Sequence, residues 1–256
     1  MNTILKKSGN RSFMMDSNKI EYTFWNFRNS DLFCELRDKL TPPSQISTWS
    51  KTDHISELLQ AGMFYETHTL LQFYNDIPSD GMILDIGANI GNHQMMFNQL
   101  WPDRRIFGFE ASPLNYLHLH KNTTKYPNTT NLCLGLGSEY GLENITHFYE
   151  NMGGSGVREV SNLRHEERDI MPIVIQPLDS IQFNSNISLV KIDVEGYETH
   201  VLKGAQKTID KHKPLIWIED FKYDSEYDNS AIKYLIEDFG YKIINRSECN
   251  FLLKVN

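Results

Sequence analysis

The sequence predicts an α/β fold in which a largely parallel sheet carries helices on both faces. From about residue 82 onward, apolar runs of strand length alternate with segments of helical periodicity, which is the pattern of consecutive βαβ units. The first apolar run, Met82 to Ile86, is followed by Gly87 and Gly91 and then by a helix-like segment. Several later runs end in acidic residues. Because ligands of open α/β sheets bind at the carboxyl ends of the strands, the same observations predict a small-molecule site.

The chain divides into an extension and a ligand-binding domain. We expect the extension over residues 1–75 and the domain over residues 76–256, because the strand–helix alternation begins near Gly81. An aromatic cluster at Tyr22–Phe27 follows a polar arm at the start of the extension. Three later stretches have helical spacing: 31–40, 54–60 and 65–73. We expect this section to cap one side of the domain, either by packing alone or as a wall of the substrate pocket. It is also a candidate homodimer interface, although the sequence leaves the oligomeric state open.

Composition narrows the classes of partner. The formal net charge is −8, whereas a general nucleic-acid binder carries a basic surface, so no nucleic-acid partner is expected. No apolar run approaches the roughly 18 residues that mark a membrane helix. The first ten residues lack the apolar core of a secretory signal. The three cysteines are widely spaced and give no zinc pattern, which fits reduced thiols and predicts a cytoplasmic protein.

The elements of the domain follow from periodicity and from turn residues. In order, we expect a strand at 82–86, a helix at 93–101, a strand at 105–109, a helix at 113–123, strands at 130–136 and 173–175, a short turn or helix at 178–180, a strand at 187–194, a helix at 198–211, a strand at 214–219, a helix at 229–239, and paired strands at 241–244 and 251–255. Residues 137–172 are rich in glycine and charge, so we expect a long irregular insertion there.

The glycine turn favours a nucleoside ligand over a dinucleotide. A dinucleotide site needs a second glycine where Asn89 stands, so that a pyrophosphate can approach the backbone. A ligand without phosphate there, such as S-adenosylmethionine, does not need that space. Glu110 ends the next apolar run, about 20 residues beyond the turn, where an acidic side chain can accept both ribose hydroxyls. The turn and Glu110 together therefore predict a nucleoside cofactor.

A second group of charges predicts the reaction centre. Lys191, Asp193 and Glu195 alternate at the end of an apolar run, and they share one face if the strand persists. Either Lys191 only pairs with an acid and holds the sheet together, or at least one of the three acts near the substrate. Asp193, Glu195 and Glu219 also offer hard oxygen ligands for magnesium, but strand-end carboxylates more often contact ribose or substrate, so no metal is expected.

The sequence resembles the FkbM family of S-adenosylmethionine-dependent methyltransferases. The resemblance spans roughly residues 63–220 and rests on ordered blocks, of which the Lys-Ile-Asp-Val-Glu-Gly block is the most specific: 85–93, 109–113, 178–180, 191–196 with Glu198, and 202–204. It implies a class I, Rossmann-like fold with a seven-stranded, mostly parallel sheet whose last strand is antiparallel. It also implies O-methylation of a sugar, polysaccharide or natural product, and so a small-molecule or glycan acceptor.

The resemblance also implies roles for single residues. Asp85, Gly87, Asn89 and Gly91 would line the methionine side of the cofactor, and Glu110 would hold the ribose. Three further residues would lie near the adenine: Ala111, Ser112 and Gly137. Glu66, in an aromatic–acid block before the glycine turn, would reach the cofactor.

Methyl transfer to a hydroxyl needs alignment and a base. The candidates are Asp193, Glu195 and His93. Asp193 ranks first because its strand end is the closest to the cofactor turn, whereas His93 lies at a helix start, where the helix dipole favours the neutral imidazole. Three other functions stay open: a binding protein that has lost turnover, a nucleic-acid methyltransferase and, least favoured, a nicotinamide dehydrogenase. The intact turn argues against the first, and the absence of an Asn/Asp-Pro-Pro block argues against the second.

Overall fold

The computed structural model describes residues 31–49, 53–148, 154–157, 168–224 and 230–255. The expected aromatic cluster at Tyr22–Phe27 lies outside these ranges. A seven-stranded sheet runs in the order β10-β11-β9-β8-β1-β2-β3. Its strands are β1 (Met82–Ile86), β2 (Ile106–Glu110), β3 (Thr129–Cys133), β8 (Ile187–Ile192), β9 (Leu215–Glu219), β10 (Tyr241–Ser247) and β11 (Asn250–Val255). Neighbouring strands are parallel along the part of the sheet that runs β9-β8-β1-β2-β3. Strand β11 is antiparallel to both of its neighbours, β9 and β10, and this arrangement confirms the predicted α/β class I fold.

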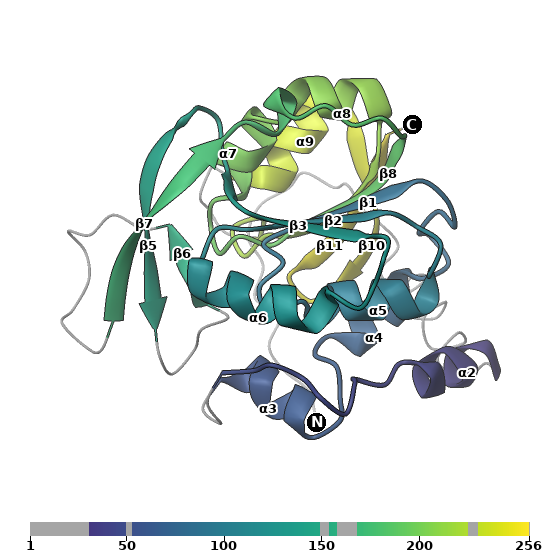
Figure 1. The fold of residues 1–256 in the computed structure, drawn as a ribbon. Coiled ribbons are helices and arrows are strands. Elements are labelled where there is room, and N and C mark those ends of the chain that lie inside the picture. Colours follow the sequence, from purple (N-terminus) through teal and green to yellow (C-terminus); the bar gives the residue numbers. More distant parts are fainter. Residues whose placement is uncertain (1–30, 50–52, 149–153, 158–167, 225–229, 256) are drawn as a thin grey trace, which may run out of the picture.

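Helices cover both faces of this sheet (Figure 1). One face carries α4 (Thr67–Phe73), α5 (Asn92–Leu100) and α6 (Pro113–Thr123), and the other carries α7 (Glu198–Lys203), α8 (Gln206–His212) and α9 (Ala231–Phe239). The short 3₁₀ turn η3 (Leu178–Ser180) lies where a turn was predicted. Among the described residues, no helix has the length and apolar character required to cross a membrane.

The N-terminal section packs on the α5 side of the sheet. Its helices are α2 (Asp31–Lys39) and α3 (His54–Gln60), and their buried Phe33, Leu36 and Leu59 belong to the same apolar cluster as Trp217 of β9. Burying aliphatic and aromatic side chains in one continuous cluster stabilises the fold in proportion to the apolar area removed from water. Helices α2 and α3 therefore help to hold the α5 side of the sheet in place.

The prediction of a long irregular insertion at residues 137–172 is wrong in part, because several described segments there are strands. A second sheet in the order β4-β7-β5-β6 is formed by β4 (Gly135–Leu136), β5 (Gly141–Phe148), β6 (Gly156–Val157) and β7 (Arg168–Gln176). It projects beside the main sheet as an arm (Figure 1). The expected strand at 130–136 is accordingly two strands, one in each sheet. Glycines and charges suggested a loop, but the antiparallel pairing of β5 with β7 satisfies the backbone of these polar strands.

The expected helix at 198–211 is two helices, α7 and α8. A Cβ at Gly204 would lie 1.9 Å from the backbone oxygen of Gly137, so this segment packs directly against the turn after β4. Gly204 ends α7 and α8 begins at Gln206. The tertiary contact with Gly137 thus explains the break, and periodicity along residues 198–211 could not reveal it.

Candidate active site

A cavity of about 390 Å³ opens at the carboxyl ends of β1, β2, β8 and β9. Seven of the predicted site residues line it: Glu66, Gly87, Asn89, Glu110, Ala111, Asp193 and Glu195. The other five lie outside its lining: Asp85, Gly91, His93, Ser112 and Gly137. The second sheet contributes Gly156, Val157 and Ile175 to the wall, and Gly154 and Ser155 just before β6 line it too. The strand ends that the sequence marked therefore converge on one cavity, as expected for an open α/β sheet.

The glycine turn is fixed by close backbone contacts. Gly87 has φ +81°, and a Cβ there would lie only 1.8 Å from the backbone oxygen of Asp193. The turn after β1 thus packs directly on the end of β8. Asn89 also adopts a left-handed conformation, at φ +50°, and its backbone N–H donates to Glu110 Oε2 at 2.7 Å.

Glu110 lies at the floor of the cavity and joins two turns. Its Oε1 accepts a hydrogen bond from the Ser112 backbone N–H at 2.8 Å. The side chain is buried, and burial raises the pKa of Glu110 to about 7 despite these two hydrogen bonds. A carboxylate oxygen has two lone pairs, so each oxygen can accept one more hydrogen bond. Such a buried acceptor on a cavity wall fits the two neighbouring hydroxyls of a ribose.

Three predicted cofactor residues support the wall from behind. Gly91 caps α5 at φ +92°, and a Cβ there would meet Leu119 and Thr123 of α6 at 3.1 Å, so its small size serves helix packing. Ser112 caps α6, and its Oγ lies 2.7 Å from Nε2 of the buried His147. Gly137 packs closely against Ile175 of the second sheet.

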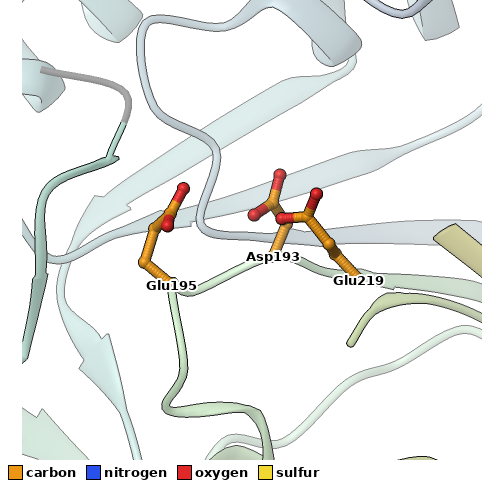
Figure 2. Close-up of side chains that lie close together, drawn as sticks. All are labelled: Asp193, Glu195 and Glu219. Carbon is orange, nitrogen blue, oxygen red and sulfur yellow. The ribbon is translucent and has the colours of Figure 1, made fainter. Parts of the chain in front are cut away.

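The charged group at the end of β8 is an ion pair with two more acids beside it. Lys191 is 1% exposed, and its Nζ lies 2.9 Å from Asp193 Oδ2. Glu195 was expected to share a face with Asp193 by alternation along the strand, but the strand ends at Ile192. The chain instead turns at Glu195, which has φ +56°. Glu219 reaches the same point from the end of β9 (Figure 2).

The pKa values of Asp193 and Glu219 are shifted in opposite directions. Burial favours the neutral form of Asp193, but the Lys191 ammonium and a hydrogen bond from Glu219 outweigh it, so the pKa of Asp193 lies below its usual range. Burial and the adjacent Asp193 charge raise the pKa of Glu219 to about 9. The thiol of Cys249 donates a further hydrogen bond to Glu219 Oε1 at 3.1 Å. At neutral pH, Asp193 is therefore ionised while Glu219 carries the proton.

The three acids could also hold a cation. One oxygen each from Asp193, Glu195 and Glu219 lies within 4.8 Å of the others, and Figure 2 shows the carboxylates converging. Oxygen ligands of this kind suit magnesium. The Lys191 ammonium already neutralises Asp193, however, and Glu219 is protonated at neutral pH, so two of the three acids need no metal to balance their charge.

Glu66 and His93 form a contact beside the cavity. His93 Nε2 lies 3.3 Å from Glu66 Oε2, and Glu66 also accepts from Asn250 Nδ2 at 2.8 Å. The His93 ring packs edge-on against Trp217, with centroids 5.1 Å apart. Asp85 is buried within β1 opposite Lys191 on β8, and burial raises its pKa. His93 and Asp85 thus lie behind the residues that line the cavity.

Several residues that line the cavity were not among the predicted site residues. These are His54, Asn115, Tyr197 and Phe221, together with residues 154–157 at and just before β6. Phe221 comes two residues after Glu219, so its place after a strand end could have drawn attention to it. Asn115 and the second-sheet residues reach the cavity only through tertiary packing.

Comparison with known proteins gives consistent results. A family model described as the methyltransferase FkbM domain matches residues 85–243. "Methyltransferase 1" of Beauveria bassiana is 27% identical over 190 residues, covering 65% of this chain and 74% of that protein. "Hexuronic acid methyltransferase AglP" of Haloferax volcanii is 29% identical over 139 residues, covering 50% of this chain and 52% of that protein. The crystal structure of a methyltransferase FkbM from Methylobacillus flagellatus aligns with a TM-score of 0.47 and 17% identity, over 88% of this chain and 58% of that chain.

Proposed function

The chain belongs to the FkbM family of S-adenosylmethionine-dependent methyltransferases, and we propose that it methylates a hydroxyl group of a sugar, polysaccharide or natural product. The observation that carries this proposal is the shared cavity of Glu110 and Asp193. Glu110 offers a buried acceptor for ribose, while Asp193 offers an ionised carboxylate to a hydroxyl donor. These two acids support a shared site in which an adenosyl group and an alcohol would lie side by side.

The lining residues fit the parts of the cofactor in order. Glu110 would hold the ribose hydroxyls, and Ala111 would lie beside the adenine. Gly87 and Asn89 would lie along the methionine portion, where the left-handed turn leads into the start of α5. Glu66, held by Asn250 and His93, would border the same portion. Bound S-adenosylmethionine would supply a methyl group carried by a sulfonium. Transfer of the methyl group would convert that sulfonium into the neutral thioether of S-adenosylhomocysteine.

The protein's part is alignment and removal of a proton. Asp193 would accept a hydrogen bond from the acceptor hydroxyl and so direct its oxygen toward the methyl group. Asp193 would take the hydroxyl proton as the acceptor oxygen binds the methyl group that leaves the sulfonium. An alcohol becomes strongly acidic as its oxygen is alkylated, so a carboxylate of low pKa is a sufficient base. Lys191 and the protonated Glu219 would hold Asp193 in this orientation.

A direct test separates this function from its rivals. Calorimetric titration should show binding of S-adenosylmethionine and S-adenosylhomocysteine and none of NAD. An acceptor screen with sugars, oligosaccharides and polyhydroxylated natural products should then release S-adenosylhomocysteine with a methyl ether as product. Cofactor binding without turnover of any acceptor would favour a binding protein, and turnover of RNA or DNA alone would favour a nucleic-acid methyltransferase.

Cofactor affinity is expected to increase with pH through about 7. The ribose hydroxyls donate hydrogen bonds, so they prefer ionised Glu110, and burial raises the pKa of this group to about 7. Between pH 6 and pH 8 the ionised fraction rises about tenfold, and the dissociation constant should fall by a similar factor. Calorimetry across this range measures the effect. Glu110→Gln should bind more weakly and lose the pH dependence, whereas an unchanged slope in Glu110→Gln would contradict the assignment.

Chelators are expected to leave methyl transfer unchanged. Lys191 and the proton on Glu219 already satisfy Asp193, so the acidic group does not require a cation to be stable. Turnover should be the same within about twofold after treatment with EDTA and after addition of magnesium. Loss of turnover in EDTA that magnesium restores would instead assign a metal to Asp193, Glu195 and Glu219.

A further inference from the structure

The cavity wall, as far as the structure describes it, is rich in carboxyl groups and contains no lysine or arginine. The described lining contains five acids: Glu66, Glu110, Asp193, Glu195 and Glu219. Within that described lining there is no lysine or arginine. A carboxylate or phosphate on an acceptor is normally matched by arginine or lysine, which donate charged hydrogen bonds. The described wall offers no such partner for an anionic acceptor.

The nearest basic side chains already have partners. Lys191 lies beneath the cavity, 1% exposed and ion-paired with Asp193. Lys222 follows Phe221 in sequence, but its Nζ lies 3.3 Å from the backbone oxygen of Gly196, and it is not part of the lining. His54 lines the cavity with its ring edge-on to Tyr65, at a centroid distance of 5.7 Å. None of these three side chains therefore presents a positive charge in the cavity for an anionic acceptor to bind.

An exposed aromatic side chain lies beside the acids. Phe221 lines the cavity and is 68% exposed, although a large apolar side chain usually gains by burial. It follows the end of β9 two residues after Glu219. Tyr65 and Tyr197 line the same cavity. Aromatic rings next to carboxylates suit a sugar ring, because its C–H face packs on an aromatic ring while its hydroxyls donate to carboxylates.

Granted the hydroxyl methylation proposed above, we infer that the acceptor is a neutral sugar-like polyol without carboxylate or phosphate. Its ring face packs on Phe221, and its hydroxyls donate to Asp193 and Glu195. An added carboxylate would face these acids at short range with no matching cation, and like charges in a partly buried site repel strongly. A neutral acceptor would distinguish this chain from the Haloferax volcanii relative that is named for a hexuronic acid.

Matched acceptors test the charge preference. The substrates are pairs of methyl glycosides, glucoside with glucuronide and galactoside with galacturonide, and the methyl ester of each uronide restores neutrality at nearly the same shape. With S-adenosylmethionine and the full chain, kcat/KM should be at least about tenfold higher for each neutral glycoside than for its uronide. The kcat/KM for the methyl ester should return most of the way to that of the neutral glycoside. A uronide that reacts as well as its neutral partner, or better, would overturn the inference.

Variants of Phe221 test the ring contact. Phe221→Ala should raise KM for the neutral glycoside about tenfold while kcat changes less than about threefold, because the ring binds the acceptor and takes no part in the reaction. Phe221→Tyr should keep the wild-type KM. Tyr140→Ala is the matched control, since Tyr140 is 71% exposed and lies outside the cavity lining. An unchanged KM in Phe221→Ala would remove Phe221 from the acceptor site.

The two proposals fail in different ways. If S-adenosylmethionine binds but no neutral hydroxyl compound in an extended panel is methylated, hydroxyl methylation itself is wrong and the acceptor inference falls with it. If neutral and anionic acceptors are methylated equally, hydroxyl methylation stands and only the preference for a neutral acceptor is overturned. Glu195→Gln sharpens this second outcome, because it should narrow the ratio between neutral and anionic acceptors.

Discussion

Replacing Asp193 with asparagine is expected to lower kcat for methyl transfer by roughly 10²–10⁴-fold, the usual contribution of a positioned base. Asparagine keeps the size of the side chain but cannot take the proton of the acceptor. It also removes the partner of Lys191, whose ammonium is 1% exposed. Steady-state kinetics on the best acceptor of the screen measures the effect. KM for S-adenosylmethionine should change little, because Asp193 acts on the acceptor side.

Two further variants control for lost stability. Asp224→Asn makes the same chemical change at an exposed carboxylate that pairs with Arg246, and it should leave kcat unchanged. His93→Ala tests another of the three predicted bases, one that lies outside the cavity lining and contacts Glu66. Melting temperatures of all three variants show how much loss arises from unfolding. If Asp193→Asn and His93→Ala both retain wild-type turnover, the assignment of the reaction centre is wrong.

Gly87→Ala is expected to destabilise the protein by about 2–4 kcal/mol and to weaken cofactor binding. Two costs add at this position. The backbone has φ +81°, which an alanine adopts only under strain, and the new Cβ would lie 1.8 Å from the backbone oxygen of Asp193. Backbone atoms cannot move aside as a flexible side chain can, so the turn must separate from the end of β8. Urea unfolding gives the free energy, and calorimetry gives the affinity for S-adenosylmethionine.

Gly62→Ala separates the two costs. Gly62 has a similar φ of +77°, but no heavy atom lies within 4 Å of a Cβ placed there. It should therefore cost only the conformational part, about 1 kcal/mol, and leave cofactor affinity unchanged. Equal losses in Gly62→Ala and Gly87→Ala would show that the contact with Asp193 adds nothing.

Local sequence patterns predicted much of the main sheet. The strands at 82–86 and 187–192 are mostly apolar, with Asp85 in the first and Ser188 and Lys191 in the second, because both faces of a central parallel strand are buried. The helix at Pro113–Thr123 was predicted at its observed bounds, since Ser112 caps it and proline suits its first turn. Such signals depend on neighbouring residues, and a sequence displays them directly.

The second sheet was missed because its signals are weak. On β5, Leu142 is 75% exposed, and its cross-strand partner Val174 on β7 is 55% exposed, so neither strand shows a clean buried face along its length. The strand predicted at 173–175 lies within β7, but only the pairing of β7 with β5, 20 or more residues earlier in the chain, identifies the sheet. The same second sheet supplies one wall of the cavity, which explains why that wall was not foreseen.

Sequence alone determined the order of strands and turns, the class of cofactor and the strand ends that carry acids, because each depends on residues close together in the chain. Tertiary structure decided the chemistry of those acids. Asp193 and Glu219 end adjacent strands, and only their contact makes one of them ionised and the other protonated. It likewise set Glu195 and Phe221 on the cavity wall and His93 behind it. A carboxyl's charge follows from its burial and its neighbours in space, and these are properties of the folded chain.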